Sequence, residues 1–193
     1  MAAETRPGTQ RWRIVVRGLV QGVGFRPFVY NEARRLGLSG FVRNDETGVT
    51  IEAEGRPEQL ALLVAALRDH APPMARVDAL TWELLPPAGG AGFAIEHSAG
   101  GGPREALISA DAAPCAACLR ELADPADRRY RYPFINCTDC GPRFTIVADV
   151  PYDRPLTTMR AFRMCPACQA EYDDPGDRRF HAQPNACPTC GPR

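Results

Sequence analysis

Eight cysteines constrain the fold of this chain more than any other feature. All of them follow residue 114 and stand in Cys-x-x-Cys pairs, which are Cys115/Cys118, Cys137/Cys140, Cys165/Cys168 and Cys187/Cys190. Eighteen residues separate the first pair from the second, and eighteen again separate the third from the fourth. Two such pairs supply the four thiolates that tetrahedral Zn²⁺ binds in structural sites. The spacing therefore predicts two zinc ions, each fully coordinated by sulfur and each serving the fold.

The cysteine register belongs to an internal duplication with a period of 50 residues, as from Cys115 to Cys165. "ADPADRRY" at 123–130 corresponds to "DDPGDRRF" at 173–180, and "CTDCGPR" corresponds to "CPTCGPR". Because each copy carries a complete ligand set, we expect one metal on the first four cysteines and one on the last four. An interleaved pairing, in which Cys115 and Cys118 join Cys165 and Cys168, stays open. Disulfides or a redox dithiol fit less well, because redox chemistry needs one exposed pair.

Other polar residues of the duplicated region suggest two further interpretations. His181 could compete as a metal ligand, but Arg131 holds the matching place in the first copy, so we expect packing or a partner contact. The arginine pairs 128–129 and 178–179 suggest nucleic-acid binding. A zinc ion with four thiolates carries a formal charge of about −2, so these arginines are expected to compensate it locally, at least in part. The 23 basic and 23 acidic residues balance, and we predict no nucleic-acid partner.

The first half of the chain has a different pattern, without cysteine. Alternation and helical spacing predict a strand near 12–16, a helix near 25–36, two strands around a turn at 47–48, a second helix after Pro57, a strand at 77–84 and a short edge strand at 92–97. This order predicts an α+β, ferredoxin-like βαββαβ fold, with helices on one face of an antiparallel sheet, followed by a small duplicated zinc-finger domain.

The segment "GLVQGVGFRP" connects the first predicted strand to the first helix. Gly22 and Gly24 can adopt backbone angles that turn successive amides inward, and the helix N-terminus adds partial positive charge. Arg26 adds a guanidinium that fits phosphate or carboxylate oxygens. We therefore predict an anion cradle from Gln21, Gly22, Val23, Gly24, Phe25 and Arg26. The alternative is a tight turn with a solvent-exposed arginine.

Two segments, "VRGLVQGVGFRPFV" and "GFVRNDETGVTIEAEG", resemble the signatures of the acylphosphatase family, over about residues 11–97. The resemblance implies that the loop amides and Arg26 bind the phosphate of an acyl phosphate and that Asn44 positions the attacking water. Both side chains are expected at the rim of a loop. The alternative for Asn44 is a turn residue before Thr47 and Gly48.

The combination with "YRYPFINCTDCGPRFTI" and "RRFHAQPNACPTCGPR" resembles the N-terminal region of the hydrogenase-maturation carbamoyltransferase family HypF. The resemblance implies a full enzyme that uses carbamoyl phosphate and ATP, forms a carbamoyl adenylate, and passes the carbamoyl group to the C-terminal cysteine of a maturation partner, toward the hydrogenase cyanide ligand. The adenylate-forming and transferase domains lie downstream in that family. We therefore expect a fragment without ATP chemistry, whose first domain hydrolyses carbamoyl phosphate and whose fingers are a scaffold.

The expected organisation is an acylphosphatase-like domain at 11–98, a linker at 99–110, and a finger domain at 111–193 with copies at 111–145 and 161–193. The sequence contains no signal-peptide pattern and no run of ~20 apolar residues, so we expect a cytoplasmic protein without a membrane partner. One alternative is a zinc-stapled protein- or nucleic-acid-binding module with an inactive first domain. A free-standing acylphosphatase is another, but it leaves the fingers unexplained.

Overall fold

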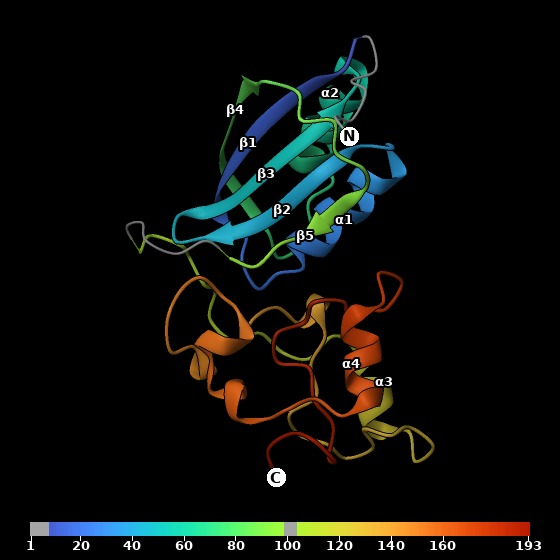
Figure 1. The fold of residues 1–193 in the computed structure, drawn as a ribbon. Helices are drawn as coiled ribbons and strands as arrows, with labels where there is room; N and C mark the ends of the chain where they lie inside the picture. The colour runs from blue at the N-terminus through green and yellow to red at the C-terminus, as the bar shows by residue number, and fades with distance from the viewer. Residues whose placement is uncertain (1–7, 99–103) are drawn as a thin grey trace.

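The computed structural model describes residues 8–98 and 104–193 (Figure 1). A sheet backed by two helices forms the first part, and loops with short helices form the second. The expected linker at 99–110 falls partly on residues 99–103, which lie outside the described residues. Within the described ranges, no helix is long and apolar enough to cross a membrane.

The sheet contains five strands in the order β4-β1-β3-β2-β5. Their bounds are β1 Gln10–Leu19, β2 Ser39–Asp45, β3 Gly48–Gly55, β4 Arg76–Leu85 and β5 Phe93–Ile95. The four long strands pair antiparallel, as predicted. The expectation of a wholly antiparallel sheet is wrong for β5, which pairs parallel with β2. The reason is that β4 runs opposite to β2, so a short connection from β4 to the far edge gives β5 the direction of β2.

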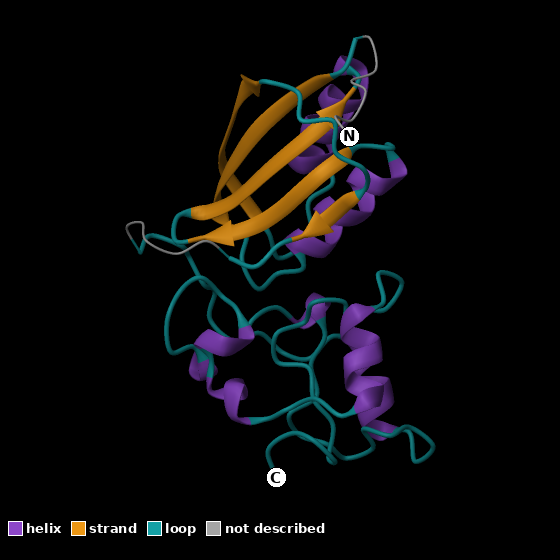
Figure 2. Ribbon diagram, viewed as in Figure 1, coloured by secondary structure: helices purple, strands orange, loops and turns teal. Residues whose placement is uncertain are grey.

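Helices α1 (Phe25–Arg35) and α2 (Pro57–Asp69) cover one face of the sheet (Figure 2). Side chains that alternate along the strands meet the apolar stripes of these helices in one core, which includes Ile14, Val16, Ile51, Val29, Leu60, Leu63 and Leu67, all fully buried. Burial of each such side chain stabilises the fold by about 1.5–3 kcal/mol. The ferredoxin-like prediction is thus confirmed, with both helices on the same side.

The second part has little regular structure. It contains α3 (Ala116–Ala123), α4 (Pro166–Asp173), and the 3₁₀ turns η1 (Thr138–Cys140), η2 (Phe144–Ile146), η3 (Arg154–Leu156) and η4 (Thr158–Ala161). Its buried cluster combines three cysteines with four other residues, namely Cys118, Cys137, Cys140, Tyr132, Ile135, Met159 and Ala186. A core this small rarely supports a fold without a staple such as a metal.

The two parts touch along the glycine loop between β1 and α1. In the second part, the amide of Tyr152 donates a hydrogen bond to the side chain of Gln21 in the loop. The carbonyl oxygen of Tyr152 accepts one from Arg26, and Asp153 forms an ion pair with Arg26. Further along α1, the ring of Tyr30 packs on that of Phe180, with centroids 5.2 Å apart. The expected anion cradle therefore faces the finger region.

Candidate functional site

The glycine loop has the positive φ angles that an anion cradle would need. Gly22 and Gly24 have φ angles of 73° and 76°, and Gly24 is the N-cap of α1. Among the hydrogen bonds of the described residues, none is donated by the backbone amides of residues 22–26. Successive unpaired amides and the positive end of a helix dipole together favour a bound anion.

Gln21 holds this loop in place with its side chain. The Gln21 Nε2 group donates to the carbonyl oxygens of Asp45 and Gly48, at 2.7 Å each. Its Oε1 accepts a hydrogen bond of 2.8 Å from the amide of Tyr152. The side chain of Gln21 is therefore engaged in ties to the β2–β3 turn and to the finger region, which leaves its backbone as the part that could face a ligand.

Arg26 is buried, with 7% of its surface exposed. Its Nη1 lies 2.7 Å from Oδ1 of Asp153, and its Nη2 donates to the carbonyl oxygen of Tyr152 at 3.4 Å. The alternative of a solvent-exposed arginine is wrong, and so is the expectation of a side chain at an exposed rim, because the finger region covers the loop. The guanidinium of Arg26 is therefore paired with an internal carboxylate.

Asn44 lies on β2 and is fully buried, again in contrast to the expected rim position. Its Oδ1 and Nδ2 have no hydrogen-bond partner within the described structure. A buried polar group without a partner costs about 1–3 kcal/mol, so the fold gains nothing from this amide. Such a residue is better explained by a ligand or a reacting water than by packing.

The turn after β2 is made by the neighbour of Asn44. Asp45 Oδ1 accepts hydrogen bonds from the amides of Thr47 and Gly48, at 2.8 and 2.9 Å, and Oδ2 accepts one from the Thr50 hydroxyl. Burial raises the pKa of Asp45, but these hydrogen bonds outweigh it and lower the pKa overall. The alternative in which Asn44 serves the turn is therefore not supported.

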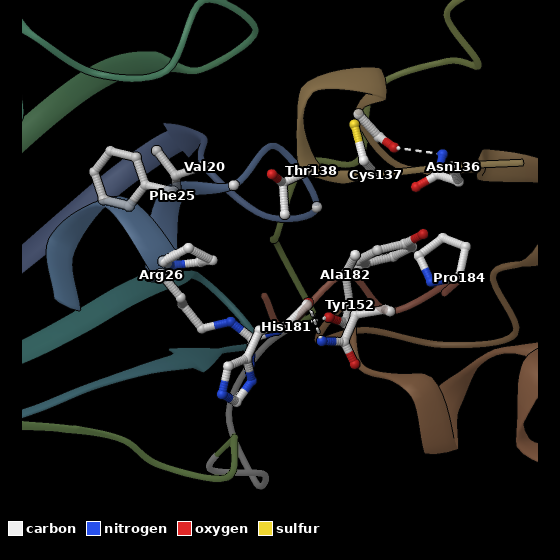
Figure 3. Close-up of a pocket in the computed structure, with 15 residues that line it drawn as sticks. Val20, Phe25, Arg26, Asn136, Cys137, Thr138, Tyr152, His181, Ala182 and Pro184 are labelled. Carbon is white, nitrogen blue, oxygen red and sulfur yellow. Dashed lines mark hydrogen bonds between the residues drawn. The ribbon is translucent and has the colours of Figure 1, made fainter. Parts of the chain in front are cut away.

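A cavity of about 20 Å³ separates the loop from the finger region (Figure 3). A space of this size holds about one water molecule. It is lined by 15 residues from both parts, including Gly22, Gly24, Arg26, Thr138, Tyr152 and His181. Asn44 is not among the lining residues, but its neighbour Asp45 is tied to the loop through Gln21.

The two glycines also allow the finger region to approach. A Cβ at Gly22 would lie 2.6 Å from Cβ of Pro142, and one at Gly24 would lie 3.2 Å from Cβ of Thr138. Any other residue at position 22 would push the two parts away from each other. Glycine therefore has two roles here, the positive φ and the close approach of a second wall.

Sequence reasoning missed the finger-side wall of the cavity. The fold places His181, which is 155 positions from Arg26 in the sequence, beside it on this cavity (Figure 3). Its imidazole packs against the rings of Tyr172 and Phe180, with centroids 4.9 and 4.7 Å away, so the expectation of packing is confirmed. Burial and the charge of Arg26 lower the pKa of His181 to about 4. The break in the duplication, where Arg131 corresponds to His181, was the available signal.

The cysteines gather into two clusters, in the sequential grouping and not the interleaved one. In the first, the Sγ atoms of Cys115 and Cys137 lie 3.6 Å apart, and those of Cys137 and Cys140 lie 3.8 Å apart. In the second, the corresponding neighbours lie 3.6–3.8 Å apart, for Cys165/Cys187, Cys187/Cys190 and Cys168/Cys190. Four sulfurs at ~2.3 Å from a tetrahedral zinc would be separated by about 3.8 Å. Both clusters thus fit a zinc ion, and α3 and α4 begin directly after the first cysteine of each.

Comparison with known proteins assigns both parts of the chain. Residues 12–95 match the Acylphosphatase family model, and residues 115–147 and 164–193 match the HypF finger. An acylphosphatase of Aeropyrum pernix is 47% identical over 96 residues, which cover 48% of this chain and 93% of that protein.

Longer matches combine the two parts. Carbamoyltransferase HypF2 of Cupriavidus necator is 56% identical over 158 residues, which cover 81% of this chain but 20% of that protein. The crystal structure of full-length HypF in the phosphate- and nucleotide-bound form superposes with a TM-score of 0.93 at 46% identity, covering 98% of this chain and 25% of that one. The chain therefore spans about a fifth to a quarter of the length of these relatives.

Proposed function

Because the chain belongs to the HypF carbamoyltransferase family, with an acylphosphatase domain followed by paired HypF fingers, we propose that it is the acyl-phosphate-handling portion of a carbamoyltransferase for nickel-iron hydrogenase maturation. Its substrate in this proposal is carbamoyl phosphate. The observation that carries the proposal is the set of unpaired amides at 22–26 beside the buried guanidinium of Arg26.

In the proposed reaction, the phosphoryl group lies against these amides and Arg26, while Asn44 orients a water molecule. The water oxygen forms a bond to phosphorus, the bond from phosphorus to the acyl oxygen breaks, and carbamate leaves with the electron pair. The proton of the water passes to the phosphate product. An acyl phosphate is already activated, so fixed charge and a positioned water supply the catalysis without a covalent nucleophile.

The remaining steps belong to the parts of the relatives that this chain does not match. We propose that ATP, the adenylate-forming and transferase domains, and a maturation partner with an acceptor C-terminal cysteine act there. Carbamate hydrolyses in water, so an enclosed route onward would protect it. Two zinc ions, held by Cys115, Cys118, Cys137, Cys140 and by Cys165, Cys168, Cys187, Cys190, would stabilise the finger fold and, through it, the second wall of the cradle.

The alternative of a nucleic-acid-binding module has less support. Its strongest argument was the paired arginines at 128–129 and 178–179, and these point inward to glutamates and cysteine sulfurs of the other copy. Side chains used in this way are not available to neutralise a phosphate backbone.

The deciding experiment measures phosphate release from carbamoyl phosphate, with acetyl phosphate for comparison. The proposal expects turnover by the zinc-loaded chain and none by Arg26→Ala. Arg68→Ala is the matched control, because Arg68 is exposed on α2. Equal rates for Arg26→Ala and Arg68→Ala would overturn the assignment of the cradle, and salt-dependent binding of nucleic acid without turnover would favour the alternative.

A further inference from the structure

In each of the two duplicated copies, an arginine reaches across the boundary and contacts a cysteine sulfur of the other copy. Arg128, in the first copy, donates from Nη1 and Nη2 to Sγ of Cys168 in the second copy, at 3.4 Å each. Arg178, the equivalent residue of the second copy, donates to Sγ of Cys137 at 3.1 Å in the first. Among the described residues, neither arginine donates to a sulfur of its own copy. The expectation that these arginines compensate the charge of the cysteine clusters is therefore confirmed for Arg128 and Arg178, and each serves the cluster of the opposite copy.

The next residue in each copy is also an arginine that pairs across the boundary, and it is more deeply buried. Arg129 pairs with Glu171 of α4, at 2.5 Å, and its side chain is 2% exposed. Arg179 pairs with Glu121 of α3, and its side chain is 4% exposed. Their Nε groups donate to carbonyl oxygens of the opposite copy, at Ala186 and Asn136. These buried pairs fix the geometry in which the outer arginines reach the sulfurs.

The net negative charge of a zinc centre with four thiolates explains why these contacts across the boundary would matter. A zinc ion with four thiolates has a net charge of about −2, and a charge in a buried site needs partners. Hydrogen bonds to the sulfurs of a metal centre are the contacts that orient and tune the ligands. The first cluster is mostly buried, and Arg178 also reaches two more of its sulfurs, Cys118 at 3.6 Å and Cys115 at 3.7 Å.

We propose that Arg128 and Arg178 are crossed positioning residues of the metal centres, so that each centre keeps its zinc through an arginine of the other copy. Arg178, which also pairs with Glu121, places its positive charge beside the sulfurs of the first centre. Arg128, which also pairs with Glu171, does so at the second. Since Arg178 reaches three sulfurs and Arg128 reaches one, the first centre depends more strongly on these contacts across the boundary. The duplicated fingers are then a single electrostatic unit, and neither copy is complete alone.

Zinc retention can be measured separately for each centre, because the positions of the arginines allow the cysteine pairs to be separated by trypsin. Cleavage by trypsin after arginine places each cysteine pair on its own peptide, namely 105–120, 132–143, 164–178 and 180–193. The zinc-loaded chain is incubated with EDTA, and cysteines that lose metal are alkylated with N-ethylmaleimide and assigned by mass spectrometry. Arg178→Gln is expected to speed labelling of peptides 105–120 and 132–143 by about 10-fold or more, since a charge-assisted hydrogen bond is lost. Arg128→Gln should speed labelling of the second centre by less.

The controls separate this role from a general loosening of the fold. Arg120→Gln and Arg163→Gln remove exposed arginines from the first and second copies, and both should leave all labelling rates unchanged. Each glutamine removes a cleavage site, so the peptides that are followed become 105–128 in Arg120→Gln, 161–178 in Arg163→Gln and 164–179 in Arg178→Gln. Arg178→Lys keeps the charge and should restore part of the retention at the first centre. Three results would each overturn the proposal. They are faster labelling of the centre in the same copy as the replaced arginine, simultaneous labelling of all four peptides, and wild-type rates in both glutamine variants. If Arg178→Gln fails to fold, Arg178→Lys is measured instead, and the expected result is again faster labelling of the two peptides of the first centre.

Discussion

Arg26 and Asp153 form an ion pair across the boundary between the sheet and the finger region, with Nη1 and Oδ1 2.7 Å apart. Their side chains are 8% and 18% exposed, so little water screens the pair. The arginine proposed to hold phosphate is therefore already bound to an internal carboxylate. The adjoining cavity of about 20 Å³ has no room for a phosphate group beside it. We expect a phosphate to compete with Asp153 for Arg26.

The first prediction concerns this competition. Asp153→Asn removes the competing charge and keeps the shape, so inorganic phosphate should bind about 10-fold more tightly, which corresponds to about 1.4 kcal/mol. Titration calorimetry at constant ionic strength measures the change. Asp149→Asn is the control, because Asp149 pairs with Arg104 and not with the cradle. Weaker phosphate binding by Asp153→Asn would mean that Asp153 orients Arg26 and does not compete.

Replacement of Arg26 itself should affect binding and rate together. Arg26→Ala is expected to abolish hydrolysis of carbamoyl phosphate and to weaken phosphate binding by at least about 10-fold, because the loop amides alone cannot balance a dianion. It also leaves Asp153 without its partner, so a lower melting temperature is expected. Melting curves recorded beside the kinetics distinguish the two effects. Full activity in a folded variant would contradict the cradle.

Asn44 should behave differently from Arg26. Asn44→Ala is expected to spare phosphate binding and to lower turnover by about 100-fold to 1,000-fold, as for the loss of one well-placed polar group at a reacting centre. Since both polar atoms of the side chain have no partner, the free energy of unfolding should not fall as it does for a hydrogen-bonded amide. Chemical denaturation and steady-state kinetics test the two halves. A large loss of stability with unchanged turnover would assign Asn44 to the fold.

His181 should make stability depend on pH. Its pKa in the folded chain is lowered to about 4 by burial and by Arg26, while Asp173 and Asp153 act in the opposite direction and His97 adds to the lowering. The neutral form is favoured on folding, so this contribution is complete above the ordinary pKa of about 6.5 and is lost as the pH falls toward about 4. His181→Phe should remove that part of the dependence. The difference between the two denaturation curves over this window is the measurement, and parallel curves would contradict it.

The sequence predicted what depends on spacing along the chain. The register of the cysteines predicted their sequential clusters, and the glycines at 22 and 24 predicted the positive φ angles of the loop. Each of these features joins residues that are close in sequence or repeat at a fixed period. The direction of β5 needed the path of the whole sheet, which alternation within a strand does not contain.

For the same reason, the contacts between the two parts could not be predicted from the sequence. The pair Arg26–Asp153 and the approach of His181 to the loop join residues more than 100 positions apart, and their formation depends on how two surfaces pack. The crossed arginines are a related case. The duplication gave the equivalence of positions 128 and 178, but a repeat pattern alone does not say whether its members act within a copy or across the boundary.

The last prediction separates the stability of the two parts. Every residue of the larger core lies between Trp12 and Phe93, so a chain ending at residue 105 should fold by itself, with a cooperative thermal transition in circular dichroism. The melting temperature should be lower than in the whole chain, because the contacts of Gln21, Arg26 and Tyr30 with the finger region are lost. Removal of zinc from the whole chain by EDTA should unfold the finger region and leave this transition in place, since three of the seven buried residues of the smaller cluster are cysteines and the other four form too small a core. A truncated chain without a transition would show that the sheet requires the fingers.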